Sequence, residues 1–212
     1  MCVIIYKPRG IELPNDETLQ KCWDCNPDGA GIAWIEDGWV IVRKGFMEFE
    51  ELLKELKKRD WTDVDLVIHF RLMSKGLKKP ELCHPFKVDH RIDQAKKLRY
   101  RTKSWVLFHN GTLTGFGGDW KSDTLDFANW LGRLKKMGLS DNGIIEVVSK
   151  IGSLDRFVLM RPGIVKLIGR WHKKEDCWFS NLSWDRLKWY YDLTIGKGNR
   201  RSWYWLYWKN ED

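Results

Sequence analysis

The chain has 212 residues, 43% of them hydrophobic, and a formal net charge of +8. This length suffices for one domain with a real core, and no internal repeat or low-complexity segment interrupts the sequence. No apolar run approaches the ~20 residues that cross a bilayer, and the N-terminus lacks the basic-then-apolar order of a secretory signal, so we expect a cytoplasmic protein without membrane contact.

Strands and helices are both indicated in the first half of the chain. They are predicted, in order, as strand 3–6, helix 16–22, strands 32–36 and 39–43, helix 48–58 and strand 64–70. Asp37-Gly38 is a strong hairpin signal between the two middle strands, because these residues accept the positive φ angles of a tight turn. The helix over 48–58 is amphipathic, with an apolar face of Phe49, Leu52, Leu53 and Leu56.

The second half begins with a long irregular segment. Residues 73–101 are basic and show no clear periodicity, and such a stretch is more often functional than idle. The elements predicted after it are strand 104–108, helices 123–137 and 142–151, and strands 157–160, 164–168 and 178–179. Strand-rich ends around two central helices indicate an α+β or layered α/β/β/α protein.

The densest basic run lies inside the irregular segment and consists of Lys96, Lys97, Arg99, Arg101 and Lys103. It raises the hypothesis of a nucleic-acid partner, which the net charge also favours. The run contains one aromatic residue, Tyr100, and the chain has no zinc-finger spacing, RNA-recognition signature or basic heptads. A solvated basic loop is therefore the favoured prediction, with nucleic acid as the alternative.

Five cysteines are an odd number, and in a reducing compartment they predict no disulfide framework. Cys22 and Cys25 have the spacing of a redox pair, but the turn residues at 26–29 prevent the helix that such a pair requires. Together with Cys83 and His84 they could supply four zinc ligands, although an adjacent Cys-His pair is awkward for tetrahedral coordination. We expect neither a metal nor an organic cofactor.

Cys2 directly follows the initiator Met1. If Met1 is removed, one residue carries both a thiol nucleophile and an α-amine, whose ordinary pKa of ~7.7–8 lets it act as a base at neutral pH. The apolar residues over 3–6 would hold this end on a rigid strand. The alternative is an ordinary first strand, since many cytosolic chains begin with a hydrophobic one.

Other polar groups stand at the ends of predicted strands. Arg71 follows the strand over 64–70, and its planar cation suits a carboxylate. Asn110 and Gly111 follow the strand over 104–108, and an amide side chain beside a backbone N–H is the donor pair of an oxyanion hole. Asp123, at the start of a helix, could bind an ammonium group, and Ser122 or Asp123 could serve as an ordinary N-cap.

The order of these motifs resembles that of class II glutamine amidotransferase domains, which are N-terminal-nucleophile hydrolases. The matching positions are Cys2 and the stretches 26–31, 69–76, 83–86, 109–111 and 122–124. Residues 157–160, 168–169 and 178–181 also look like late strands of that family. The chain is most similar to short, stand-alone members found in phage genomes, which would place it in the host cytoplasm. The resemblance covers roughly residues 2–184.

This resemblance implies a four-layer αββα sandwich over 1–185 and a catalytic set of Cys2, Asn110 and Gly111. Cys2 would attack the side-chain amide of glutamine while its α-amine carries the proton, and Asn110 with the Gly111 N–H would stabilise the oxyanion. Ammonia and glutamate would be released. The implied substrate-binding residues are Arg71 for the α-carboxylate, Asp123 for the α-ammonium, and Ser74, Gly76, His84 and His109.

The chain departs from the family at residues 70–76, where the family's sequence is Thr-Arg-Trp-Ala-Thr-His-Gly. This chain keeps Arg71 and Gly76 and has Ser74 for the second Thr, but it carries Leu72, Met73 and Lys75 in place of the family's Trp, Ala and His. Full amidotransferases also append a synthase domain that consumes the ammonia. We therefore expect a separate ammonia-accepting partner protein or plain hydrolysis. The alternative is a catalytically inactive module of the same fold that binds nucleic acid or protein.

Tryptophan is unusually frequent, with 14 residues, and half of them fall in the last fifth of the chain. The segment 186–212 is predicted to be a Trp-rich C-terminal extension. Its aromatic residues favour an edge strand with two apolar faces, and a docking surface is the alternative because Trp and Tyr are enriched in interface hot spots.

Overall fold

A computed structural model describes residues 2–73, 77–151 and 155–185 of the chain. The chain divides into two units, Met1–Asn181 and Leu182–Asp212, and only residues 182–185 of the second unit are described. The predicted Trp-rich extension over 186–212 therefore lies outside the described residues. No helix among the described residues is long and apolar enough to cross a membrane.

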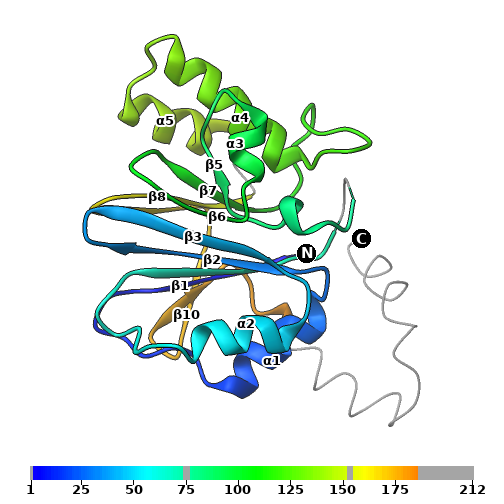
Figure 1. The fold of residues 1–212 in the computed structure, drawn as a ribbon, viewed down its shortest axis with the longest axis vertical. Helices are drawn as coiled ribbons and strands as arrows, with labels where there is room; N and C mark the ends of the chain where they lie inside the picture. The colour runs from blue at the N-terminus through cyan, green and yellow to red at the C-terminus, as the bar shows by residue number, and fades with distance from the viewer. Residues whose placement is uncertain (1, 74–76, 152–154, 186–212) are drawn as a thin grey trace. The chain divides into compact units, whose positions relative to one another are not determined.

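The first unit contains the strands and helices shown in Figure 1. In chain order they are β1 (Val3–Lys7), α1 (Asp16–Cys25), β2 (Ala30–Glu36), β3 (Trp39–Phe46), α2 (Phe49–Leu56), β4 (Leu66–Phe70), η1 (Pro80–Leu82), β5 (Phe86–Lys87), α3 (Ile92–Lys96), β6 (Arg99–Thr102), β7 (Val106–Asn110), α4 (Asp123–Lys136), α5 (Asp141–Ile151), β8 (Arg156–Arg161), β9 (Ile164–Ile168), β10 (His172–Lys174) and β11 (Cys177–Phe179).

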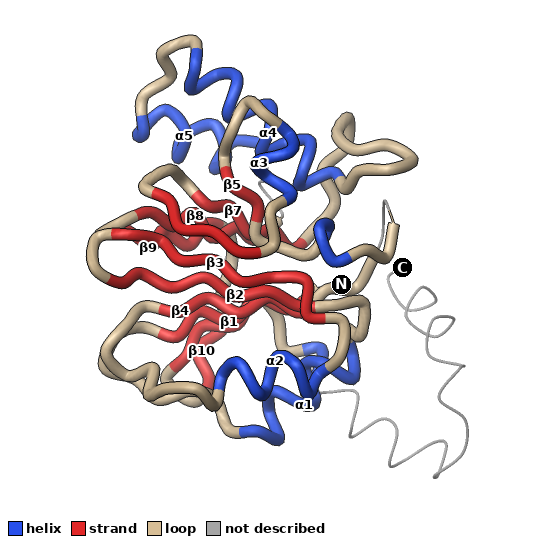
Figure 2. The backbone as a smooth tube through the Cα atoms, in the orientation of Figure 1, coloured by secondary structure: helices blue, strands red, loops and turns tan. Residues whose placement is uncertain are grey.

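These strands form two antiparallel sheets. The larger sheet has seven strands in the order β10-β11-β1-β4-β2-β3-β6, and the smaller one has four in the order β5-β7-β8-β9. Figures 1 and 2 show α1 and α2 beyond the larger sheet and α3, α4 and α5 beyond the smaller one. The predicted α+β class is confirmed. β1 lies inside the larger sheet, with β11 on one side and β4 on the other.

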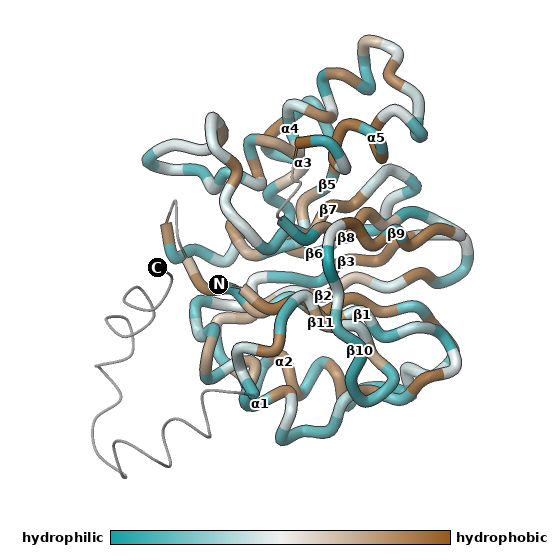
Figure 3. Tube along the Cα trace, turned by 180° about the vertical axis from the view of Figure 1, so that it is seen from behind, coloured by the Kyte–Doolittle hydropathy of each residue, from teal (hydrophilic) through white to brown (hydrophobic). Residues whose placement is uncertain are grey.

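Apolar side chains from both sheets share one core. Strands of the larger sheet contribute Ile4, Ala33, Val42 and Val67, and strands of the smaller sheet contribute Val106, Phe108, Val158 and Met160. A second core lies between the smaller sheet and helices α4 and α5. Figure 3 shows the hydrophobic colouring along the strands that these cores require. Because β1 is buried on both faces, the residue that precedes it is held at a fixed place.

Local sequence signals explain several of these elements. Asp37 and Gly38 have φ angles of 49° and 72°, so the predicted hairpin between β2 and β3 is confirmed. Helix α1 begins after Asn15, whose side chain accepts a hydrogen bond from the Thr18 N–H at 2.8 Å. It continues to Cys25, beyond the predicted end at residue 22.

The buried face of α2 includes Glu55. Leu53, which the apolar pattern predicted to be part of this face, is only half-buried. The carboxylate of Glu55 forms ion pairs with Arg43 of β3 and with Lys58. A buried carboxylate is tolerated here because both partners supply charge and hydrogen bonds. This placement depends on contacts between elements, which the helical periodicity does not contain.

The irregular segment over 73–101 contains short elements that its pattern did not indicate: η1, β5, α3 and most of β6. The prediction of a solvated basic loop over residues 96–103 is wrong in part, because 99–102 form a strand paired with β3. Lys44 of β3 holds this segment against the larger sheet, since its buried Nζ donates hydrogen bonds to the carbonyl oxygens of Glu81 at 3.1 Å and Ala95 at 3.0 Å. Burial lowers the pKa of Lys44 to about 7.

Gly31 lets the same segment pass close to β2. A Cβ atom at this position would lie 2.0 Å from the carbonyl oxygen of His84, a distance that no side chain could accept without movement of the backbone. The strand predicted over 32–36 begins two residues earlier in the structure, because Ala30 and Gly31 already belong to β2. The absence of a side chain at Gly31 brings His84 against the sheet.

Candidate active site

Cys2 lies beside the end of β4 because of the strand register. The antiparallel pairing of β1 and β4 places Val3 opposite Phe70, so the residue before β1 meets the residues after β4. The Leu72 N–H donates to the half-buried Cys2 Sγ, and the thiol in turn lies against the Leu72 carbonyl oxygen, both at 3.3 Å. The structure therefore brings together Cys2 and Arg71, two residues that are 69 positions apart in the sequence.

Burial is the main influence on the Cys2 thiol and raises its pKa. The hydrogen bond from Leu72 and the positive charge of Arg71 act in the opposite direction, whereas the negative charge of Asp123 raises the pKa further. Both charged groups are thus close enough to act on the sulfur. A thiol in this environment stays neutral at pH 7 and needs a nearby base to become a nucleophile.

Arg71 is almost fully buried, with 4% exposure. Its backbone bonds to the loop before β2, through the Gly29 carbonyl oxygen at 2.8 Å and the Asp28 N–H at 3.0 Å. One guanidinium nitrogen, Nη1, donates to the Leu77 carbonyl oxygen at 3.0 Å. The other, Nη2, is buried without a hydrogen-bond partner among the described residues. A buried cation with an unused donor is suited to bind an anionic group of a ligand.

Asn110 ends β7 with 1% exposure, and its side chain reaches Ser180. Its Nδ2 lies 2.9 Å from Ser180 Oγ, which also accepts the Ile4 N–H at 2.9 Å. Asn110 Oδ1 is buried without a partner in the part of the chain that the structure describes. In this arrangement the Ser180 oxygen accepts twice while the nearby amide oxygen accepts nothing.

A rotation of the Asn110 amide by 180° gives a better hydrogen-bond arrangement. The Ser180 hydroxyl then donates to Asn110 Oδ1, while its oxygen keeps the bond from the Ile4 N–H. Nδ2 takes the place of the unpaired oxygen and becomes a free donor. Ser180 thus determines which end of the Asn110 amide is available, a role that the sequence patterns did not reveal.

Asp123 is buried at the start of α4, just after the actual N-cap Ser122, which accepts the Leu125 N–H at 3.2 Å. Asp123 Oδ2 accepts the Leu113 N–H at 2.8 Å, and Oδ1 accepts the Thr124 N–H at 2.7 Å. These bonds from neutral donors hold the carboxylate in place and leave its negative charge uncompensated by any ion pair among the described residues. The site therefore contains one fixed cation and one fixed anion.

Gly111 follows Asn110 with a φ angle of 155°, and a Cβ atom there would lie 1.8 Å from Asp155 Oδ1. The absence of a side chain lets Asp155 approach the strand end, where its Oδ2 lies 3.4 Å from His109 Nε2. Asp155 was not identified from the sequence, because no local pattern links residue 155 to residue 111.

Three buried histidines form a chain behind the strand ends. His84 Nδ1 lies 2.7 Å from His69 Nε2, which also lies 3.3 Å from the His109 carbonyl oxygen. A carbonyl only accepts, so His69 Nε2 carries the hydrogen and His84 Nδ1 is an acceptor. His109 Nδ1 bonds to Thr124 Oγ1 at 2.9 Å, and its ring stacks on Phe157.

Burial is the main cause that lowers the pKa of His69 to about 3, with Arg71 and His109 adding to the effect. The pKa of His84 is also lowered, again chiefly by burial. Protonation would place a hydrogen on His69 Nδ1, a buried atom without a partner among the described residues. The predicted substrate contacts of His84 and His109 stay predictions, and the observed contacts of their rings are within the protein.

The remaining candidates are placed apart from this cluster or lie outside the described part. Ser74 and Gly76 fall in the gap at 74–76. Cys22 and Cys25 lie on α1 and form no disulfide, and burial raises the pKa of Cys25 to about 11, the opposite of what a redox cysteine requires. The described residues hold no group of three or more His, Cys, Asp or Glu side chains that could bind a metal.

Asn181 is a further residue of the site that was recognised only as part of a late strand. Its Nδ2 donates to the Cys2 carbonyl oxygen at 2.8 Å, and the neighbouring Ser180 N–H donates to the Ile4 carbonyl oxygen at 2.9 Å. The end of β11 therefore fixes the first residues of the chain. A polar pair directly after an apolar strand was the available signal.

No family model and no curated protein matches the chain. Its fold is similar to that of the solved structure of glutamine phosphoribosylpyrophosphate amidotransferase from B. subtilis, complexed with ADP and GMP, with a TM-score of 0.52 and 18% sequence identity. The match covers 84% of this chain and 41% of that chain. At this identity the similarity shows the fold alone.

The buried histidines predict how stability depends on pH. Unfolded His69 titrates near ~6.5, so below that pH the unfolded chain binds a proton that the folded chain refuses, and stability falls as the pH falls. His69 should contribute a loss of about 2 kcal/mol between pH 7.5 and 5. Urea unfolding across this range should show a shallower pH dependence for His69→Gln. His90→Gln is the surface control, and an unchanged slope in His69→Gln would contradict the assignment.

Proposed function

We propose that this protein hydrolyses the side-chain amide of glutamine through a thioester on Cys2, and that its two sheets and flanking helices form the four-layer αββα sandwich of N-terminal-nucleophile hydrolases. The observation that carries the proposal is the position of Cys2 beside the buried Arg71, whose Nη2 lacks a partner among the described residues. A nucleophile and a free donor for a carboxylate at one strand end suit an amino-acid substrate.

Removal of Met1 supplies the base that the buried thiol needs. The α-amine of Cys2, with an ordinary pKa of ~7.7–8, takes the thiol proton as sulfur attacks the amide carbon. The C–N bond then breaks, ammonia leaves with that proton, and a γ-glutamyl thioester remains. Water, activated by the same amine, attacks the thioester and releases glutamate and the free thiol.

The oxyanion of each tetrahedral intermediate requires fixed donors. Asn110 Nδ2, in the orientation that accepts the Ser180 hydroxyl at Oδ1, and the Gly111 N–H would supply them. Ser180 acts through Asn110 and is a positioning residue. His84 and His109 are better assigned a role in holding the site in place than in direct contact with the substrate, since their rings bond to other residues of the protein.

The two fixed charges of the site match the charges of an α-amino acid. Arg71 would bind the α-carboxylate through Nη2, and Asp123 would attract the α-ammonium. Ser74 and Gly76 are proposed to complete the carboxylate site. The released ammonia would pass to a separate partner protein or to water.

The first test is ammonia release from glutamine by protein with and without Met1, determined by intact mass. Processed protein should release ammonia, whereas unprocessed protein and Cys2→Ala should be at least 1,000-fold slower, because an amide nitrogen is not basic and alanine is not a nucleophile. Cys25→Ala is the matched control and should retain full activity. Equal ammonia release by wild type and Cys2→Ala would reject the proposal, and no release by either protein would leave an inactive binding module.

The second test asks whether Ser180 acts through Asn110. Asn110→Ala should lower kcat by ~100-fold or more, as removal of an oxyanion donor does. Ser180→Ala should lower kcat by about tenfold with KM nearly unchanged, and Ser180→Thr should restore most of the rate because it keeps the hydroxyl.

The double variant gives the decisive comparison. If Ser180 only orients the amide, adding Ser180→Ala to Asn110→Ala should have no further effect on kcat. Fully multiplicative effects would show that Ser180 contributes independently of Asn110, for instance by holding β1, and would reject the positioning role.

A further inference from the structure

The edge strand β6 of the larger sheet carries a row of cations on one face. Tyr100 and Thr102 turn toward the interior, and Tyr100 packs on the core between the sheets. Arg99 and Arg101 are therefore on the outer face, and Lys103 continues the alternation just past the strand. All three are exposed and span ~13 Å at ~3.3 Å per residue.

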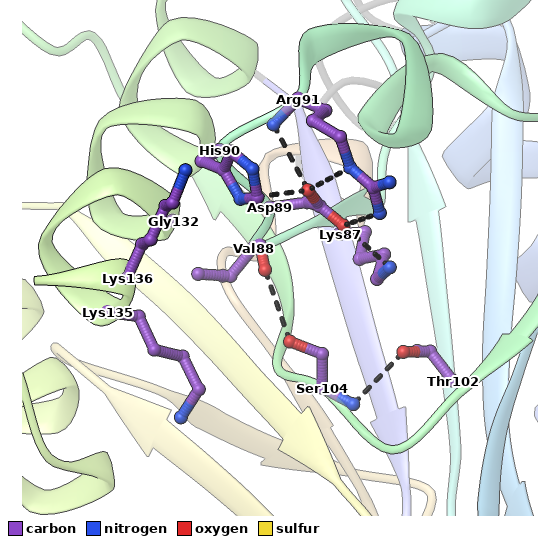
Figure 4. Close-up of a pocket in the computed structure, with 10 residues that line it drawn as sticks. All are labelled: Lys87, Val88, Asp89, His90, Arg91, Thr102, Ser104, Gly132, Lys135 and Lys136. Carbon is purple, nitrogen blue, oxygen red and sulfur yellow. Dashed lines mark hydrogen bonds and ion pairs between the residues drawn. The ribbon is translucent and has the colours of Figure 1, made fainter. Parts of the chain in front are cut away.

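These cations have no ion-pair partner within the described ranges, unlike Lys87 and Arg91 on the opposite side of β6. There, Thr102 and Ser104 line an open pocket of about 350 Å³ (Figure 4). Asp89 in that pocket pairs with Lys87 and Arg91. Although burial opposes the shift, hydrogen bonds from Arg91 and Lys87 lower the pKa of Asp89 to about 2. Asp89 thus offsets part of the positive charge of this pocket, whereas no carboxylate among the described residues pairs with Arg99, Arg101 or Lys103 on the outer face of β6.

Tryptophan rings lie against cations near both ends of β6. Trp39, in the neighbouring strand β3, lies beneath Arg101 and Lys103, at 4.8 and 4.9 Å from its ring centre. Trp120 is 51% exposed and lies 4.9 Å from Lys96, the residue that ends α3 shortly before β6. An exposed indole on a soluble protein is uncommon and often belongs to a binding surface.

We infer that this outer face, from Lys96 and Trp120 along β6 to Trp39, binds single-stranded nucleic acid. Unpaired arginines and lysines attract phosphates, and the exposed indole of Trp120 and the half-buried one of Trp39 offer surfaces on which bases stack without sequence preference. Charges on an edge strand also prevent sheets from pairing with one another, but that role requires no exposed tryptophan such as Trp120. The face is separate from the cysteine site and does not depend on the proposed catalysis.

The probe is a fluorescently labelled oligothymidine, with binding followed by anisotropy over a range of salt concentrations. The variant Arg99→Ala/Arg101→Ala/Lys103→Ala should bind at least tenfold more weakly at low salt. The slope of log affinity against log salt should become shallower by about 2, since each phosphate contact to a single strand contributes about 0.7. Circular dichroism and the thermal midpoint establish that the variant is folded.

A matched control removes the same charge elsewhere. Lys54, Lys166 and Arg170 are exposed and lie on α2, on β9 and just after β9. Their triple alanine variant should bind like wild type. Trp39→Ala and Trp120→Ala should each weaken binding about tenfold while leaving the salt slope unchanged, because stacking does not release counterions. Cys2→Ala should bind normally.

Four results would overturn the inference. Wild-type protein could fail to bind oligothymidine at low salt, or the control triple variant could lose affinity as much as the β6 variant. Equal competition by polyglutamate, with no effect of the tryptophan changes, would identify a nonspecific polyanion surface. A duplex of the same length that binds more tightly than the single strand would likewise reject the assignment.

Discussion

The pairing of β1 with β4 is the constraint on which the candidate site depends. Val3 stands opposite Phe70, and the register continues to Lys7 opposite Leu66. A shift by one residue would turn Ile4 out of the core between the sheets and move Cys2 away from Arg71. Because β1 is buried on both faces, the register of the hydrophobic core also fixes the chemistry at the strand end.

Lys44 and Arg71 are two buried cations that differ in their unused hydrogen-bond capacity. Lys44 is as buried as Arg71, yet its ammonium bonds two backbone carbonyls and holds the segment around η1 and α3. Arg71 has an unpaired Nη2, and Asn110 has an unpaired amide atom, in the part of the chain that the structure describes. A buried unpaired group costs roughly 1–3 kcal/mol, and a ligand that bonds to Arg71 and Asn110 would recover this cost.

Local patterns predicted what depends on neighbouring residues, namely most strands, the hairpin at Asp37-Gly38 and helix α4 with its N-cap. They also placed Arg71 and Asn110 at strand ends, where the structure has them. The roles of Ser180 and Asp155 could not be found in this way, since they arise from strand pairing over long sequence distances. The segment 73–101 was missed because contacts such as those of Lys44, more than periodicity, stabilise its short elements.

The most direct measurement is the mass of the protein after rapid mixing with glutamine and quenching in acid, followed by peptide mapping. The account predicts a γ-glutamyl thioester on Cys2 of a chain that lacks Met1, and no adduct on Cys25, which serves as an internal comparison. An adduct on another residue, or turnover of glutamine by a chain that retains Met1, would contradict it. So would turnover without any acyl-enzyme under conditions where its formation outpaces its hydrolysis.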